Sequence, residues 1–445
     1  MAAAAARRTA KEMDPPPPPV DRLSNLPDAQ LDDILNRLTL RDAVRTSAIS
    51  RAWRRRWESV HGLALSFPDG TPCSAVDSIL LRHIGGVSRF SFTLHAADSS
   101  SADPRIDDWL VALSRRGGRV GVESISINLQ AAKGFFSTPL HSSIFSCARL
   151  VSLNLHSFSI PPLPVGFAGF PLLRELYLSH IVYTIDDDEN RLQGMVHGSP
   201  LLRLLYLDEV DAPGDFVIEA PSLQSLTLIS SEMKSDWRFG ELPCLQYASI
   251  DVAEYMQHGL PVEDGYGFLE FLARFSQVRE LILNSPTYTF RIHGVPFIFH
   301  NLKSLELWTQ FNFMHHILLM FSILRTSPNL EILKIKLRRQ GMIANPEFLN
   351  AQWTDGMCTN LQVVQITSAE GWLPLSFMKL ILSKVSLLRT LSVDECPASQ
   401  DDPLNELLNC TIASAQAQVL FKDKLDEINF DRMKFAEKDS PKERA

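Results

Sequence analysis

A short pattern of apolar and polar positions returns along most of the chain and is its strongest regularity. The pattern reads apolar–x–x–apolar–x–apolar, and its copies begin at Leu150, Leu173, Leu202, Leu223, Leu245, Val278, Leu302, Leu330, Leu361 and Leu388. Alternating apolar positions are typical of a strand that buries one face. One such strand cannot cover its own apolar face, so stacked copies are expected to share a continuous core and a parallel sheet.

Helical patterns and prolines separate these strand-like units. Apolar residues recur with helical spacing in 191–200, 268–277, 314–328 and 375–386. Prolines stand two residues before five of the units, at Pro171, Pro200, Pro221, Pro243 and Pro328. Proline ends a preceding helix and favours an extended entry, so its recurrence supports the assignment of repeats.

The predicted fold is therefore α/β. Unit starts lie roughly 21 to 33 residues apart, close to the period of about 20–29 of leucine-rich repeats. We predict an irregular leucine-rich-repeat solenoid over 61–400, with parallel strands on the concave side and helices and loops on the convex side. Weaker copies are expected near Arg89 and Val122, and the asparagine usual after the repeat strand is mostly missing.

A separate helical pattern occupies residues 21–60. Leu31, Ile34, Leu35 and Leu38 recur at helical spacing, and Asp42 can begin a second helix that carries Val44 and Ile49. Trp53 and Trp57 lie four residues apart, which predicts one face of a third helix. About 40 residues cannot bury all of these side chains internally, so the surplus is expected to form an interface.

The same segment resembles an F-box of plant F-box proteins. The matching positions are Leu26-Pro27, Ile34-Leu35, Leu38, Arg41-Asp42, Ser50-Arg51, Trp53 and Trp57. Thr39 and Ala29-Gln30 depart from the family pattern without removing an apolar anchor. The resemblance implies docking onto a Skp-family adaptor, and through it onto a cullin/RING ubiquitin ligase. The adaptor contacts it implies are Leu26, Pro27, Ile34, Leu35, Leu38, Val44, Trp53 and Trp57.

The remaining segments complete the predicted organisation. The segment 355–400 is similar to the FBD segment that follows the repeats in many plant F-box proteins. Residues 1–20 are expected to be a disordered leader rich in alanine and proline. Residues 401–445 are expected to form a capping helix and a charged tail. The alanine run is too short for a signal peptide, so we expect the cytoplasm and/or nucleus.

Composition and motifs argue against several kinds of functional site. The net charge of −8 argues against a surface built for nucleic acid. The six cysteines show no zinc-ligand spacing, and no phosphate loop or catalytic motif is present. The adjacent pair His315-His316 has poor geometry for joint metal binding on a helix. We therefore expect no catalytic residue, no metal, no cofactor and no membrane partner.

The concave face remains as the predicted binding surface for an unknown target protein. Its candidate residues are Tyr177, Arg203, Tyr206, Lys303 and Glu306. The first hypothesis is the substrate-recognition subunit of an SCF ubiquitin ligase. The alternative is an F-box/leucine-rich-repeat scaffold that binds the adaptor without delivering a substrate for degradation. A third hypothesis, a solenoid that needs a small-molecule or polyphosphate cofactor, has no basic pocket in the sequence to support it.

Overall fold

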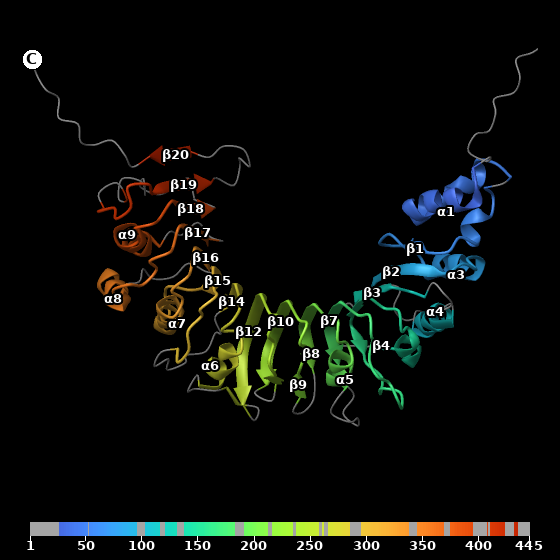
Figure 1. The fold of residues 1–445 in the computed structure, drawn as a ribbon, viewed down its shortest axis with the longest axis horizontal. Helices are drawn as coiled ribbons and strands as arrows, with labels where there is room; N and C mark the ends of the chain where they lie inside the picture. The colour runs from blue at the N-terminus through green and yellow to red at the C-terminus, as the bar shows by residue number, and fades with distance from the viewer. Residues whose placement is uncertain are drawn as a thin grey trace, which may run out of the picture.

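The structure is a computed structural model of the 445-residue chain. It describes residues 26–434 apart from 52, 96–102, 116–120, 131–137, 183–190, 212–215, 235–236, 258–259, 262–265, 285–294, 338–344, 369–373, 395–406, 408–409 and 423–430. The described elements form an open arc, with the N-terminal helices at one end and the last strands at the other (Figure 1). The predicted leader and the end of the predicted tail lie outside the described residues.

The N-terminal end of the arc is a small helical module. It contains α1 (Asp28–Arg37), α2 (Leu40–Arg45), and the short 3-10 segments η1 (Thr46–Ala48) and η2 (Arg56–Glu58). Thr39 caps α2, because its hydroxyl oxygen accepts a hydrogen bond from the Asp42 backbone N–H at 3.2 Å. The predicted third helix is the short 3-10 segment η2 instead of a full α-helix. Turns and η2 occupy that stretch, and they still bring Trp53 and Trp57 into the core.

A long parallel sheet follows, and its main strands pair in chain order. These strands are β1 (Leu63–Ser66), β2 (Val87–His95), β3 (Ser124–Gln130), β5 (Ser152–His156), β7 (Glu175–Val182), β8 (Leu204–Asp211), β10 (Ser225–Lys234), β12 (Tyr247–Gln257), β14 (Glu280–Asn284), β15 (Ser304–Thr309), β16 (Ile332–Leu337), β17 (Val363–Ser368), β18 (Thr390–Asp394) and β19 (Gln418–Lys422). Every predicted unit coincides with one of these strands. The weaker copies near Arg89 and Val122 fall at β2 and β3.

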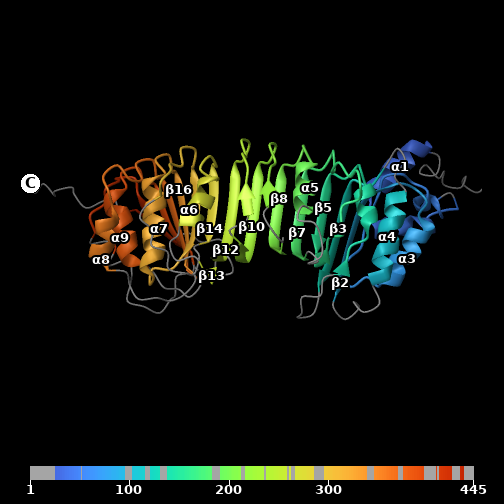
Figure 2. The same ribbon diagram turned by 90° about the horizontal axis from the view of Figure 1, so that it is seen from below.

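The outer side of the arc carries helices and short strands. The helices are α3 (Cys73–Arg82), α4 (Asp103–Arg115), η4 (Ser142–Ser146), α5 (Arg191–His197), α6 (Tyr266–Ala273), α7 (Met314–Arg325), α8 (Pro346–Gln352) and α9 (Leu375–Lys384). The short strands are β4 (Thr138–Pro139), β6 (Phe158–Ser159), β9 (Phe216–Ile218), β11 (Trp237–Phe239) and β13 (Leu260–Pro261). Seen from below, the helices lie in front of the sheet, so the strands line the inner side (Figure 2). The predicted α/β solenoid is confirmed.

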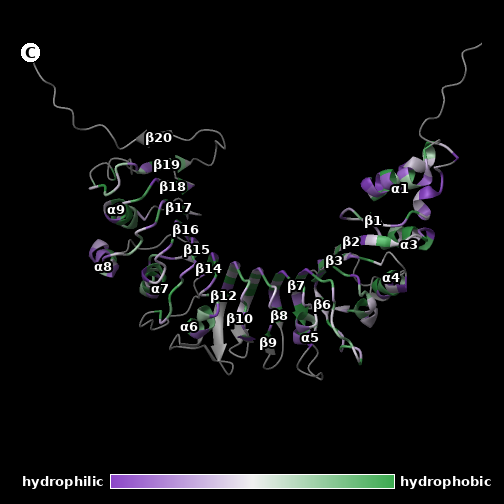
Figure 3. Ribbon diagram, in the orientation of Figure 1, coloured by the Kyte–Doolittle hydropathy of each residue, from purple (hydrophilic) through white to green (hydrophobic). Residues whose placement is uncertain are grey.

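Alternation along the strands builds the core. In β16, Leu333 and Ile335 are buried while Lys334 and Lys336 on the other face are half-exposed. Figure 3 shows hydrophobic and hydrophilic residues alternating along the strands. The buried residues form one continuous cluster that extends from Leu31 in α1 to Val419 in β19.

Tight turns set the entry to each strand. The prolines found before the strands stand second in turns that a backbone hydrogen bond closes, as from the Leu202 N–H to the Ser199 carbonyl at 3.0 Å. Further along the chain, asparagines in these turns tie each turn to the preceding repeat. The Asn329 side chain donates to the His300 carbonyl at 2.8 Å, and the Asn360 side chain to the Pro328 carbonyl at 2.9 Å.

The C-terminal end adds strands that the sequence did not predict. The capping helix expected after residue 400 falls partly on 401–406 and 408–409, outside the described residues, and 418–422 form β19, which pairs parallel with β18. A strand here satisfies the backbone groups along the edge of β18, and it buries Val419 completely. The strand β20 (Asp431–Lys434) then pairs antiparallel with β19.

Candidate protein-interaction surfaces

The core of the N-terminal module is completed by the first repeat. Leu35 and Trp57 are 0% exposed and Trp53 is 2% exposed. The Trp57 ring stacks on His83 with centroids 6.4 Å apart, and the Arg82 guanidinium lies 5.2 Å from its centroid. The expectation that these three side chains contact an adaptor is therefore corrected. They are buried within this chain, because the solenoid supplies the surface that an isolated 40-residue module would lack.

The other predicted adaptor contacts remain accessible. Pro27 is exposed, and Leu26, Ile34, Leu38 and Val44 are half-buried at the edge of the core. Ile49, which the sequence grouped with Val44, is 54% exposed. We call the set Leu26, Pro27, Ile34, Leu38, Val44 and Ile49 the module surface. Its apolar side chains are available to a partner without unfolding the module.

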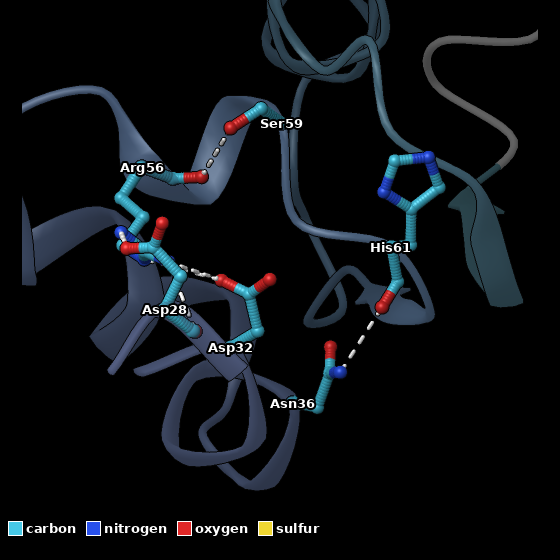
Figure 4. Close-up of polar contacts among 6 residues, drawn as sticks. All are labelled: Asp28, Asp32, Asn36, Arg56, Ser59 and His61. Carbon is cyan, nitrogen blue, oxygen red and sulfur yellow. Dashed lines mark hydrogen bonds and ion pairs between the residues drawn. The ribbon is translucent and has the colours of Figure 1, made fainter. Parts of the chain in front are cut away.

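Arg56 fastens α1 to the end of the module. Its guanidinium donates to the Asp28 carboxylate at 2.8 Å, to the Asp28 carbonyl at 2.9 Å and to the Asp32 carboxylate at 2.9 Å (Figure 4). Nearby, the Asn36 side chain donates to the His61 carbonyl at 3.0 Å. The Arg56 side chain is only 19% exposed, because it lies against Asp28 and Asp32. These two partners stand one turn apart in α1. This spacing in the sequence is the signal that could have predicted an arginine bound between them.

Glu58 joins the module to α3. Its carboxylate accepts from Arg55 at 2.8 Å and from Arg82 at 2.6 Å, and Glu58 itself is 5% exposed. Burial acts to raise the pKa of Glu58, but the hydrogen bonds and charges of the two arginines outweigh it and hold that pKa below its ordinary value. The Ile84 backbone N–H also donates to the Glu58 carbonyl at 2.6 Å. The junction is thus a packed and charged contact rather than a loose linker.

The inner face of the sheet carries rows of polar side chains. Because the strands are parallel and in register, Tyr177 lies beside Tyr206, with ring centroids 5.9 Å apart. Asp208 accepts at Oδ2 from the Ser179 hydroxyl at 2.6 Å and from the Tyr206 hydroxyl at 3.5 Å. Burial, and then the neighbouring carboxylates Glu175 and Asp208, raise the pKa values of Tyr177 and Tyr206. Both tyrosines therefore stay neutral at physiological pH.

The other predicted target contacts occupy different positions. Arg203 and Lys303 are exposed, and each stands one residue before a strand, on the rim of the inner face. Lys303 pairs with Glu331 at 2.8 Å. Glu306 is only 9% exposed, because Lys336 pairs with it at 2.6 Å and the Trp308 indole donates to it at 3.1 Å. Glu306 therefore orders its neighbours instead of offering a free carboxylate.

Three features of the described residues bear on metal binding, thiol chemistry and membrane insertion. No group of three or more His, Cys, Asp and Glu side chains in them could hold a metal ion. Burial raises the pKa of the Cys147 thiol to about 11 and that of Cys358 to about 12, so both thiols stay protonated and unreactive. In the part of the chain that the structure covers, no helix has the length and apolarity needed to cross a membrane.

The family models and the related sequences agree with this architecture. Residues 23–63 match the model of the F-box domain, and residues 106–335 match the model of the leucine-rich repeats of the FBD-associated F-box protein At5g56370. The F-box/FBD/LRR-repeat protein At1g13570 of Arabidopsis thaliana is 27% identical over 90% of this chain and 98% of its own length. The F-box/FBD/LRR-repeat protein At3g52680 of the same plant is 28% identical over 72% of each chain. Among solved structures, an internalin from Listeria monocytogenes aligns with 66% of this chain and 80% of its own, at 15% identity and a TM-score of 0.30.

Proposed function

Because this chain belongs to the FBD-associated F-box family with leucine-rich repeats, we propose that it is the substrate-recognition subunit of an SCF-type E3 ubiquitin ligase. The F-box would dock a Skp-family adaptor, and through it a cullin/RING ligase, while the repeats hold a target protein. The observation that carries the proposal is the pairing of an accessible module surface with a solenoid whose described helices lie on the outer side of the sheet. The complex is expected in the cytoplasm and/or nucleus.

The proposed contribution to ubiquitin transfer is proximity. A subunit that binds both the ligase and a target raises the effective concentration of the target's lysines near the activated ubiquitin. It needs no catalytic group of its own for this role. We accordingly place this chain among the non-catalytic receptors.

The junction supports this role. Backbone hydrogen bonds cross it from the Gly62 N–H to the Gly86 carbonyl at 2.7 Å and from the Ile84 N–H to the Glu58 carbonyl at 2.6 Å. Together with the Trp57–His83 stack, these bonds hold the module and the first repeat as one unit. A bound target would then stand at a defined distance and orientation from the adaptor.

A matched pair of isoleucine substitutions tests adaptor binding. Ile49→Asp places a charge on the module surface, and Ile298→Asp does the same on the solenoid, where Ile298 is 47% exposed. Both sites are open to water, so both variants should fold. When each chain is co-expressed with a Skp adaptor, we expect Ile49→Asp to lower the co-purified adaptor at least tenfold and Ile298→Asp to leave it unchanged. Failure of the wild-type chain to co-purify the adaptor would contradict the proposal.

Delivery of a substrate is a separate outcome. Proteins that accumulate when this chain is absent, and also when the proteasome is inhibited, would identify targets for degradation. If no protein accumulates although the adaptor binds, the scaffold alternative replaces the degradation role.

A further inference from the structure

We propose that the inner face between β7 and β12 docks a basic segment of the target protein, with the tyrosine pair Tyr177 and Tyr206 and the carboxylates of Asp208 and Asp251 as its contacts. That the partner is a target of the ligase rests on the proposed function. The preference of the surface for lysine and arginine rests on its geometry alone.

The register of the sheet sorts charge by position. Three rows of side chains cross the inner face, and from β3 to β15 the charged residues on them are Glu175, Asp208, Asp251, Glu280 and Glu306, all acidic. The nearby cations Arg174, Arg203 and Arg279 stand on the rim, one residue before β7, β8 and β14. Lysines return to the inner face only at β16, where Lys336 pairs with Glu306. Over β7 to β14 the fold thus separates an acidic inner face from a basic rim.

The distance between rim and face decides which charge a partner meets. Arg203 and Asp208 lie five residues apart along an extended stretch, which is about 16 Å at roughly 3.3 Å per residue. Charges in water are largely screened beyond about 8 Å at physiological ionic strength. A segment that lies over the third row, at the Asp208 end of the strands, therefore meets carboxylates and little of the field of the rim.

The Asp208 site is ordered in advance. Its Oδ2 already accepts from Ser179 and Tyr206, and Oδ1 accepts no hydrogen bond from the described residues. A lysine or arginine could pair with Oδ1 and lay its aliphatic stem and cationic head against the two tyrosine rings. Cation–π contacts contribute about 0.5–2 kcal/mol, and tyrosines held in place lose little entropy on binding.

The spacing of the carboxylates sets the pattern in the partner. Asp208 and Asp251 stand on the same row, with β10 and its Ile229 between their strands, and the Asn284 side chain donates to the Asp251 carboxylate. Two strand spacings are about 10 Å, close to the rise of about 9 Å over three residues of a polyproline II segment, whose residues i and i+3 lie on the same side. The fitting segment has lysine or arginine three positions apart.

Selection from a random library tests this inference on the complex of the full chain with its Skp adaptor. Random 12-residue peptides displayed on phage are selected on the wild-type complex, and lysine and arginine are expected to be enriched over aspartate and glutamate. One selected peptide, labelled with fluorescein, then gives dissociation constants by anisotropy. Asp208→Asn keeps the shape of the site and should weaken binding at least tenfold, as should Tyr206→Ala.

The control is Asp33→Asn, which removes the same charge from the exposed Arg37 pair on α1. It should change the dissociation constant less than twofold. Selection of acidic or uncharged peptides, selection of none, or equal effects of Asp208→Asn and Asp33→Asn would each overturn the inference. The co-purified adaptor in the same samples reports separately on the proposed function, so the two can fail independently.

Discussion

At the scale of single residues, Glu58 shows how a buried acid keeps its charge. Its carboxylate is nearly closed off from water, yet Arg55 and Arg82 both donate to it while remaining largely exposed themselves. The arginines stay hydrated, so only one group of the three is strongly desolvated. This arrangement avoids much of the cost of a fully buried ion pair.

The depressed pKa of Glu58 has a consequence for stability against pH. A carboxyl whose folded pKa lies below its unfolded pKa, which is about 4.3, stabilises the fold above that unfolded pKa. The contribution is lost as the pH falls through the folded pKa. Glu58→Gln should therefore lower the free energy of unfolding by about 2 kcal/mol at pH 7, since hydrogen bonds to charged groups are lost.

Urea unfolding of wild type and Glu58→Gln at pH 7 and at lower pH checks this prediction. The difference between the two proteins should shrink as the pH drops below about 4.3. A difference that stays constant with pH would mean that Glu58 acts only through its shape.

At the scale of elements, α1 depends on contacts made far along the chain. Leu31 and Leu35 bury one face of this ten-residue helix, and Arg56 holds the side that carries Asp28 and Asp32. A helix this short is not stable alone in water. Its position, and with it the position of Ile34 on the module surface, is set by these tertiary contacts.

Arg56→Ala should therefore destabilise the protein more than loss of an ordinary surface charge. We expect a decrease of about 1–3 kcal/mol, because the four charge-assisted hydrogen bonds of the guanidinium are lost. Arg37→Ala, which removes an exposed pair with Asp33 within the same helix, should cost less than about 1 kcal/mol. Thermal unfolding followed by circular dichroism measures both. Equal decreases in the unfolding temperature of the two variants would show that the Arg56 hydrogen bonds stabilise the protein no more than an exposed ion pair does.

At the scale of the whole molecule, the module and the solenoid share one core. The buried cluster passes from Leu31 and Leu35 through Trp57 into the first strands without a break. The module should therefore unfold together with the first repeats. In repeat proteins stability is carried by contacts between neighbours, so the junction acts as the cap of the N-terminal end.

Trp57→Ala tests this shared core. It should cost about 3–5 kcal/mol, as expected for removing a large buried aromatic side chain. It should also abolish slow hydrogen exchange at the Gly62 and Ile84 amides, whose bonds cross the junction. Trp308→Ala, on the inner face near the other end, should leave those two amides protected. Retained protection in Trp57→Ala would indicate that the module folds independently.

Residue order alone determined the repeat, because alternating leucines at a regular spacing bury only one face and must stack. It also determined the F-box anchors and the outer helices α5, α6, α7 and α9, since these depend on local periodicity. It did not determine which anchors point outward. Leu35 and Trp57 are indistinguishable from Ile34 and Ile49 by their sequence pattern. Only the packing of the first repeat against the module decides which side chains are buried and which are available to a partner.

The inner face and the C-terminal end were likewise decided in three dimensions. The register between strands places Tyr177 beside Tyr206 and Asp208, although they lie about 30 residues further along the chain. It also places Glu306 against Lys336 and Trp308, which bury its carboxylate. At the far end, the open edge of β18 pairs with β19, a strand that local periodicity did not predict. Periodicity is a property of neighbours in sequence, whereas burial, pairing and the sorting of charge depend on neighbours in space.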